Sequence, residues 1–215
     1  MTTKIPQEQA AFRFEEEGHK YFLGQMELPS VTTILNTMYP RQWNPGDWYM
    51  QRGSAIHKAI ALYVEDKLDI TQWSEALLES LGDAETDIVL SKVKAAMLFL
   101  KECGYKVLDI ETPMYSPGLL FAGTRDCRLH GAGELILADW KSSLDARVEL
   151  QLGGYYRLTK DFDNSAYTSG VAVELLDTGK YKCKWYPKRQ LELFAQEFVA
   201  IRSAYGSGIK RGLFA

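Results

Sequence analysis

Two aspartates and a lysine stand close together in the stretch GTRDCRLHGAGELILADWKSS, residues 123–143. Asp126 lies within one apolar run, and Asp139 ends a second apolar run. Lys141 follows Asp139 by two positions. A buried carboxylate is costly unless a charged group pairs with it. Carboxylate oxygens are also the ligands that suit a hard divalent ion such as Mg²⁺. The pattern therefore predicts a site that holds a cation.

The glycine-rich stretch HGAG at residues 130–133 predicts a hairpin between the two apolar runs. With the turn at residues 131–132, the numbers of facing residues sum to 263. That register places Asp139 on the same face as Asp126, one diagonal step away, at a backbone separation of about 7–8 Å. Side chains alternate along a strand, so Lys141 shares that face.

Metal-assisted hydrolysis is the chemistry that these three residues suit. A divalent ion polarises a phosphoryl oxygen and lowers the pKa of a bound water. A neighbouring lysine orients that water or offsets charge on the phosphate. The alternative is a strand end with a surface salt bridge. A second acid-x-Lys triplet at residues 65–67 falls at a predicted helix end, where positions i and i+2 do not face each other.

The elements that must position these residues follow an order that predicts a mixed α/β layer fold. Strands are expected at 11–15, 19–28 (turning at 24–25), 106–115, 120–129, 134–142, 168–176 and 180–186. Helices are expected after Ser30 as N-cap, from about Asp47, and over 84–103, 145–161 and 188–204. Trp140, next to Asp139 on its strand, is expected to point into the packing.

The length of 215 residues suits one domain, with an N-terminal hairpin and aromatic-basic segment at 11–45 and a core at 46–204. The composition, 46% hydrophobic and 25% charged, is that of a globular chain. The net charge of −3 indicates no global basic field. This argues only mildly against a nucleic-acid partner, because metal ions can supply the missing positive charge.

The three cysteines stand far apart and form no CxxC pair, which disfavours a zinc site or an iron–sulfur cluster. Such sparse cysteines are typical of an intracellular protein. The N-terminal residues contain no apolar run like that of a signal peptide, and no stretch of about 18 apolar residues occurs. We therefore expect a cytoplasmic protein with no membrane partner.

Several segments resemble, in order, those of RecB-like nucleases of the PD-(D/E)XK superfamily, of the type found in prophages and similar to the mitochondrial genome-maintenance exonuclease. The segments are HKYFLGQMELPSVTTIL, RGSAIHKAIALY, IETPMYSP, FAGTRD, LADWKSS and QLGGYY, and they cover roughly residues 19–155. The resemblance implies a restriction-endonuclease-like core. That core has a central mixed sheet flanked by helices, and here a small N-terminal hairpin and a helical insert.

The resemblance also implies roles for individual residues. Asp126 and Asp139 would bind a metal ion together with the backbone carbonyl of Trp140, and Lys141 would be catalytic. His57 would be a further ligand or a group that supports the ligands. Mg²⁺ is the expected cofactor, with Mn²⁺ as a substitute. Some members of the family hold an iron–sulfur cluster, but their cysteine set is absent from this sequence.

Other residues have both a functional and an ordinary interpretation. Gln151 and Tyr155 match the family's Q-x-x-x-Y motif and share a helix face, which would support the site or the substrate strand, or simply be an amphipathic face. Glu111 is a candidate ligand of a second metal ion or a residue that positions water. The alternative is an ordinary surface glutamate on a strand. His57 is otherwise a core histidine. Gly123 allows a backbone to approach closely, unless it marks a bulge.

Candidates for substrate binding lie in the segment MYPRQWNPGDWYMQR, which includes Trp43, Trp48 and Arg52. Aromatic side chains stack on unpaired bases, with about 1–3 kcal/mol for each, and arginines hold phosphates. The alternative is a hydrophobic flap over the core. A second basic group could track phosphates or be a solvated face; it comprises Lys182, Lys184, Lys188 and Arg189.

The leading hypothesis is a Mg²⁺-dependent DNA exonuclease in phage or bacterial recombination and repair. Its partner would be DNA, single-stranded or with free ends, and a phage single-strand annealing protein is a candidate protein partner. The first alternative is a structure-specific or site-specific endonuclease on the same fold. The second is a non-catalytic DNA-binding or partner-binding module. Fold alone does not decide among these functions.

Overall fold

The helices and strands follow one another largely as the sequence predicts. The computed structural model describes residues 11–40 and 46–214. The strands are β1 Phe12–Glu15, β2 Lys20–Leu23, β3 Met26–Leu28, β4 Lys106–Ser116, β5 Phe121–Gly131, β6 Glu134–Lys141, β7 Ser169–Leu175 and β8 Tyr181–Pro187. The helices are α1 Val31–Met38, α2 Gly46–Val64, α3 Ile70–Leu81, α4 Asp83–Glu102, α5 Arg147–Phe162 and α6 Lys188–Lys210.

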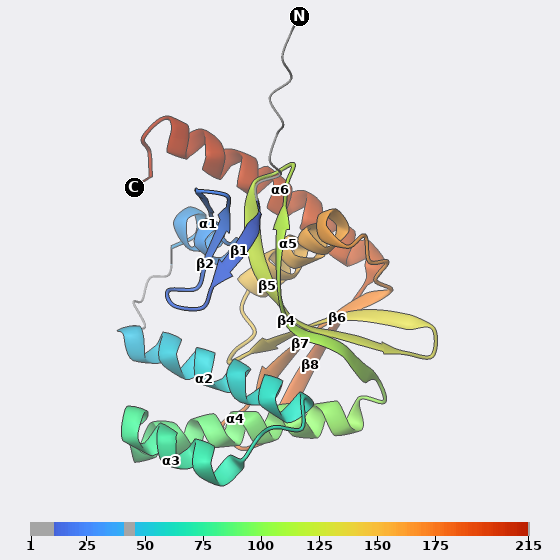
Figure 1. Cartoon of the computed structure of the whole chain (residues 1–215). Coiled ribbons are helices and arrows are strands. Elements are labelled where there is room, and N and C mark those ends of the chain that lie inside the picture. Colours follow the sequence, from blue (N-terminus) through green and yellow to red (C-terminus); the bar gives the residue numbers. More distant parts are fainter. Residues whose placement is uncertain (1–10, 41–45, 215) are drawn as a thin grey trace, which may run out of the picture.

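A five-stranded sheet forms the centre of the molecule, in the order β4-β5-β6-β7-β8. Neighbouring strands are antiparallel except β6 and β7, which run parallel and are joined through α5. A separate antiparallel sheet of β1, β2 and β3 packs beside β5 (Figure 1). The expected α/β architecture, a mixed sheet flanked by helices, is therefore confirmed.

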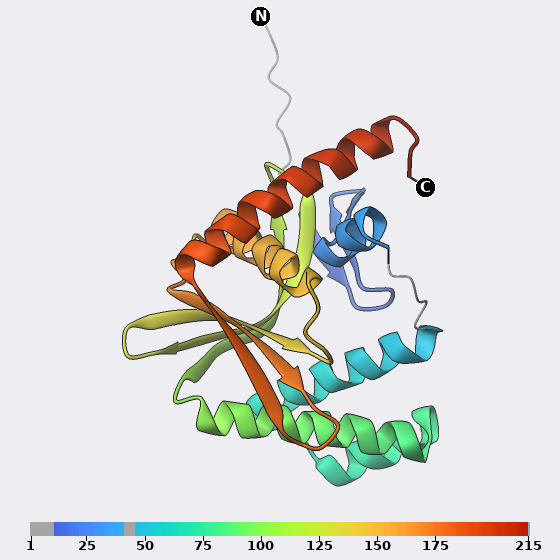
Figure 2. The same ribbon diagram turned by 180° about the vertical axis from the view of Figure 1, so that it is seen from behind.

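Helices cover both faces of the large sheet (Figures 1 and 2). Helices α2, α3 and α4 bury one apolar cluster, in which Trp140 is 2% exposed and packs edge-on against Phe99. The inward direction expected for Trp140 is confirmed. Helices α1, α5 and α6 bury a second cluster on the other face, with α6 lying across α5 (Figure 2).

Side-chain caps fix the start of two helices, α1 and α3. The Ser30 hydroxyl accepts a hydrogen bond from the Thr33 N–H at 2.9 Å, so the expected N-cap of α1 is confirmed. Helix α3 was not predicted, although Asp69 caps it by accepting from two first-turn N–H groups. Helix α6 continues to Lys210, beyond the expected end at 204.

The register of the β5–β6 hairpin differs from the predicted one. Residues Gly131 and Glu134 pair, so the numbers of facing residues sum to 265 and not to 263. The turn residues are Ala132 and Gly133, with φ of 51° and 79°. Such a two-residue turn needs left-handed backbone at both positions and favours glycine at the second, which Gly133 supplies. A shift of two in the sum leaves every side chain on its predicted face.

Two glycines let α5 approach its neighbours closely. A Cβ at Gly153 would overlap the backbone of Phe194 in α6. A Cβ at Gly123 would lie 3.0 Å from the Tyr155 ring, so Gly123 permits close packing of α5 on β5. The bulge interpretation of Gly123 is wrong, because the register shift between β4 and β5 lies at residues 107–109. Close packing brings Tyr155 to the strands that carry the predicted acids.

Candidate active site

The candidate site lies where β5 and β6 separate. Their ladder ends at the pair Cys127–Ala138, one residue before the two aspartates would face each other. Beyond that pair, the Asp126 carboxylate accepts a hydrogen bond from the Trp140 N–H through Oδ2, at 2.8 Å. The side chain thus replaces a strand-to-strand hydrogen bond. Asp126 is 5% exposed and Asp139 is fully buried.

Lys141 shares the face of Asp139, as the alternation predicts. Its Nζ lies 2.5 Å from Asp139 Oδ2 and donates to the Trp140 carbonyl at 3.2 Å. The carbonyl expected to bind a metal therefore accepts from the lysine. Among the described residues, no group donates a hydrogen bond to Asp139 Oδ1. A buried carboxylate oxygen without a donor is unusual and suits a cation ligand.

His57 and Glu111 complete the cluster from α2 and β4. His57 Nδ1 lies 2.9 Å from Glu111 Oε1 and 3.7 Å from Asp126 Oδ1. The nearest ligand atoms of these three residues all lie within 4.8 Å of one another. We call His57, Glu111, Asp126, Asp139 and Lys141 the carboxylate cluster. His57 faces these acids, so its interpretation as an ordinary core histidine is disfavoured.

Glu111 holds an unusual backbone conformation for a strand residue. Its φ is +46°, in the left-handed region that residues other than glycine rarely adopt. The flanking pairs, Ile110–Cys127 and Thr112–Arg125, place Glu111 opposite Asp126. Such a conformation costs about 1–3 kcal/mol and is concentrated at functional sites. Here it accompanies a carboxylate that bonds to His57.

The cluster holds more acids than cations, and the pKa values respond to this. Burial and the nearby charge of Asp126 raise the pKa of Asp139 to about 7, although the charge of Lys141 opposes the shift. Burial also raises the pKa of Asp126, although His57 and Lys141 oppose the shift. Burial alone would lower the pKa of His57, but the charges of Asp126 and Glu111 outweigh it and raise this pKa to about 9. Without a metal ion, the cluster therefore retains extra protons.

Gln151 and Tyr155 reach the cluster from α5. Gln151 Nε2 donates to the Tyr155 hydroxyl at 2.9 Å, so their predicted common face is confirmed. Burial raises the pKa of Tyr155 well above its ordinary value, and the charges of Asp126 and Asp139 add to the shift. Tyr155 therefore stays a neutral phenol beside the acids.

The structure places the proposed substrate-binding residues only in part. Trp43 and the side chain of Trp48 lie outside the described residues. Arg52 is 12% exposed and pairs with Glu85 of α4 at 3.0 Å, so its guanidinium already has a partner inside the protein. In the second basic group, Lys184 pairs with Glu149 of α5, so the ammonium group of Lys184 lies beside α5.

The small N-terminal sheet adds two residues that the sequence analysis did not assign. The Tyr21 hydroxyl lies 2.8 Å from the Thr124 hydroxyl and 2.7 Å from His19 Nε2. Burial lowers the pKa of His19, and the charge of His57 lowers it further. The alternation of residues 20–23 signals that Tyr21 points inward. No local pattern links it to Thr124, about a hundred positions away.

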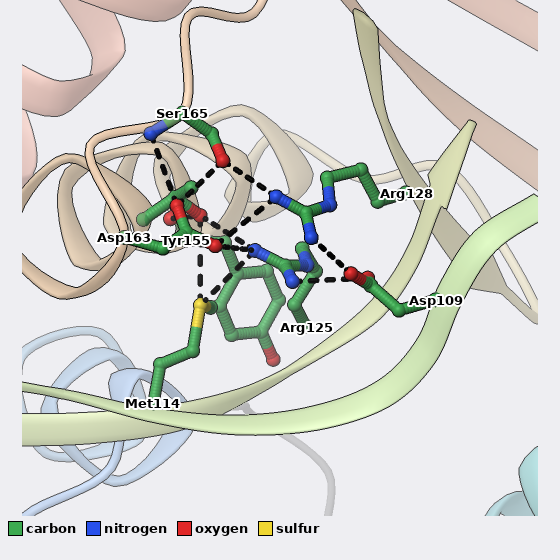
Figure 3. A network of polar contacts seen from close by, with 8 residues as sticks. Asp109, Met114, Arg125, Arg128, Tyr155, Asp163 and Ser165 are labelled. Atoms are coloured by element: carbon green, nitrogen blue, oxygen red, sulfur yellow. Dashed lines mark hydrogen bonds and ion pairs between the residues drawn. The ribbon is translucent and has the colours of Figure 1, made fainter. Parts of the chain in front are cut away.

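A second charged group, which we call the arginine network, lies on β4, β5 and the loop after α5 (Figure 3). Arg125 is 1% exposed and pairs with Asp109 at 2.9 Å and Asp163 at 3.3 Å. Arg128 contacts the same two aspartates and Ser165. Figure 3 shows Asp109 facing both guanidinium groups. None of these five residues was among the predicted site residues.

Comparisons with known proteins assign no family to this arrangement. No protein-family model matches the chain, and no curated protein matches it. Within residues 11–40 and 46–214, none of the helices has the length and apolar character needed to cross a membrane.

Proposed function

We propose that this chain is a divalent-metal-dependent nuclease of the PD-(D/E)XK type that hydrolyses phosphodiester bonds of DNA. The observation that carries the proposal is the meeting of three acids, a histidine and a lysine at the point where β5 and β6 separate. They come from α2, β4, β5 and β6, so only the fold brings them together.

The residues present fit a divalent ion. Asp126 and Glu111 offer oxygen atoms, His57 offers Nδ1, and Asp139 Oδ1 is buried without a donor among the described residues. An oxygen-rich set with one imidazole suits Mg²⁺ or Mn²⁺. A divalent ion held there would polarise a phosphoryl oxygen and lower the pKa of a bound water.

Lys141 supplies the fixed positive charge for this chemistry. Burial alone would lower its pKa, but Asp139 and Asp126 outweigh burial and raise it, so the ammonium stays charged. Asp139 and the Trp140 carbonyl hold the ammonium in place. A donor fixed in this way stabilises charge that develops on a phosphate without the cost of reorganising solvent.

Action from DNA ends is part of the proposal. The aromatic-basic segment at 38–52 immediately precedes and enters α2, the helix that carries His57. Stacking of unpaired bases on Trp43 or Trp48 would help to offset the few kcal/mol needed to separate terminal bases. The motif resemblance also favours an exonuclease over an endonuclease.

The test is incubation of purified protein with end-labelled linear DNA and closed circular DNA, single-stranded and double-stranded, with Mg²⁺, Mn²⁺ or EDTA. We expect linear strands to be degraded only with a divalent ion, and circular single strands to survive. Asp126→Asn and Asp139→Asn should abolish turnover. Hydrolysis that persists in EDTA would refute the metal requirement, whereas efficient cutting of circles would favour an endonuclease.

A further inference from the structure

A cavity of about 200 Å³ lies beside Lys141, and His57 is not among its lining residues. Its walls are α1, the connection from β6 to α5, and the first turns of α5. At about 30 Å³ for each water molecule, it holds a small solvated group and not a whole nucleotide. Lys141 and Gln151 both line this cavity. Lys141 also belongs to the carboxylate cluster, and Gln151 bonds to Tyr155.

Hydrogen-bond donors dominate the lining of the cavity. Thr32, Ser142 and Ser143 contribute to the lining; Thr32 and Ser143 are exposed and Ser142 is half-buried, so their hydroxyls are open to a ligand or to solvent. The guanidinium of Arg147 adds a second cation beside that of Lys141. This combination of open hydroxyls and two cations suits an anion with several oxygen atoms.

The one carboxylate in the cavity wall is already engaged. Asp145 Oδ1 accepts from the Arg147 N–H at 2.9 Å, and Asp145 Oδ2 lies 3.8 Å from Arg147 Nε. Arg147 also donates to the Asn36 side chain and the Tyr39 carbonyl, which hold it at the cavity. The positive end of the α5 dipole lies at the same place and favours a negative ligand. Lys141 and Arg147 thus each have a carboxylate partner, Asp139 and Asp145, and the N-terminal end of α5 adds partial positive charge at the cavity.

We propose that this cavity is a phosphate subsite, which binds the phosphate next to the one that is cleaved. The inference rests on the proposed nuclease function, because Lys141 borders both the carboxylate cluster and the cavity. A strand whose reacting phosphate lies at the carboxylates would place its neighbouring phosphate within reach of Ser142, Ser143 and Arg147. The same chemistry accepts an internal phosphodiester or a terminal phosphate.

The first test measures binding without catalysis. Inorganic phosphate is titrated against metal-free protein in EDTA, and bound phosphate is followed by ³¹P NMR. The double substitution Ser142→Ala/Ser143→Ala should weaken phosphate binding by at least about tenfold, because one hydrogen bond to a charged group already accounts for a loss of that size and two hydroxyls are removed. Ser203→Ala, an exposed serine on α6, is the matched control and should bind like the unchanged protein. Equal binding by both variants would overturn the proposal.

The second test uses oligonucleotides that carry a 5′-phosphate, a 3′-phosphate or only terminal hydroxyls, with Arg147→Gln as a second variant. The salt dependence of single-strand affinity should lose about 0.7 in its logarithmic slope, the amount for one phosphate contact. A loss with all three strands identifies an internal phosphodiester, and a loss confined to one terminus identifies that terminal phosphate. An unchanged slope would overturn the subsite. Because this assay needs no turnover, its result stands apart from failure of the nuclease proposal.

Discussion

Two buried groups of charges lie next to each other along β5, and they differ in charge balance. The arginine network sets Arg125 and Arg128 against Asp109 and Asp163. Partial burial would raise the pKa of Asp163, but hydrogen bonds from Ser165 and the two arginines outweigh it, and the pKa is lowered. Asp109 and Asp163 share the same two arginines as partners.

The carboxylate cluster is the opposite case. Three acids face one lysine and one histidine, and the pKa of Asp139 rises to about 7. Arg125 and Asp126 are adjacent in sequence. Arg125 belongs to the arginine network, where charges are balanced, whereas Asp126 belongs to the carboxylate cluster, where acids outnumber cations. Under the proposed function, a divalent ion would supply the missing positive charge of the cluster.

The largest expected effect is that of Arg125→Ala on stability. It should lower the free energy of unfolding by about 3–5 kcal/mol, because Asp109 and Asp163 lose a buried partner. Urea denaturation measures the change. Arg157→Ala removes a partly exposed i,i+4 pair with Asp161 and should cost less than about 1 kcal/mol. Similar losses for the two variants would contradict a special role for the arginine network.

Lys141→Ala should reduce kcat by about 10²–10³-fold, since it removes a fixed donor to the developing charge. Single-strand affinity should fall much less, and circular dichroism should show an unchanged fold. The control is Lys67→Ala, which removes only an exposed pair with Glu65 and should leave kcat unchanged. If both substitutions slowed the reaction equally, the strand position of Lys141 would have no particular importance.

The stability of the metal-free protein should fall as the pH rises from about 4 to about 9. Asp139 has a folded-state pKa of about 7, above its unfolded value, so its contribution is lost as the pH rises toward and through 7. The raised pKa of His57, about 9, acts in the same direction between about 6.5 and 9. At about 1.4 kcal/mol for each unit of raised pKa, the two groups together correspond to a fall of several kcal/mol. Thermal unfolding in EDTA at stepped pH values measures it.

Mn²⁺ should reverse this pH dependence, because binding displaces protons from the ligands. The melting temperature in Mn²⁺ should exceed that in EDTA by more at pH 8 than at pH 6. Asp139→Asn should flatten the metal-free curve between pH 4 and 7. A curve for Asp139→Asn identical to that of the unchanged protein would show that Asp139 does not carry the effect.

The smallest expected effects are those of removing one negative charge from each group. At pH 8 without metal, Asp139→Asn should raise the free energy of unfolding by about 1 kcal/mol, because it removes an excess buried charge. Asp109→Asn should lower it by about 1–3 kcal/mol, because two arginines lose their shared anion. Chemical denaturation of the two variants in parallel tests the opposite signs. If the free energy of unfolding changed in the same direction in both variants, the two groups would not differ in charge balance as described.

Local patterns in the sequence were enough to predict the strands around Asp126 and Asp139 and the face that they share with Lys141. Side-chain alternation depends only on parity, so the prediction survived a register error of two in the facing sum. The helical spacing of Gln151 and Tyr155 was equally local, and their side chains bond to each other as expected. Such predictions succeed because the backbone period of each element decides them.

Tertiary structure alone decided which distant residues lie beside Asp126, Asp139 and Lys141. Glu111 reaches His57 through a left-handed backbone that no strand pattern predicts, and Tyr21 reaches Thr124 from a separate sheet. Arg125 lies buried in a run that alternation alone cannot distinguish from an ordinary strand, because its partner Asp163 follows a helix that comes later in the chain. Long-range packing also sets the burial that raises the pKa of Asp139. Charge balance in the interior is a property of the assembled fold, since it depends on which side chains meet away from water.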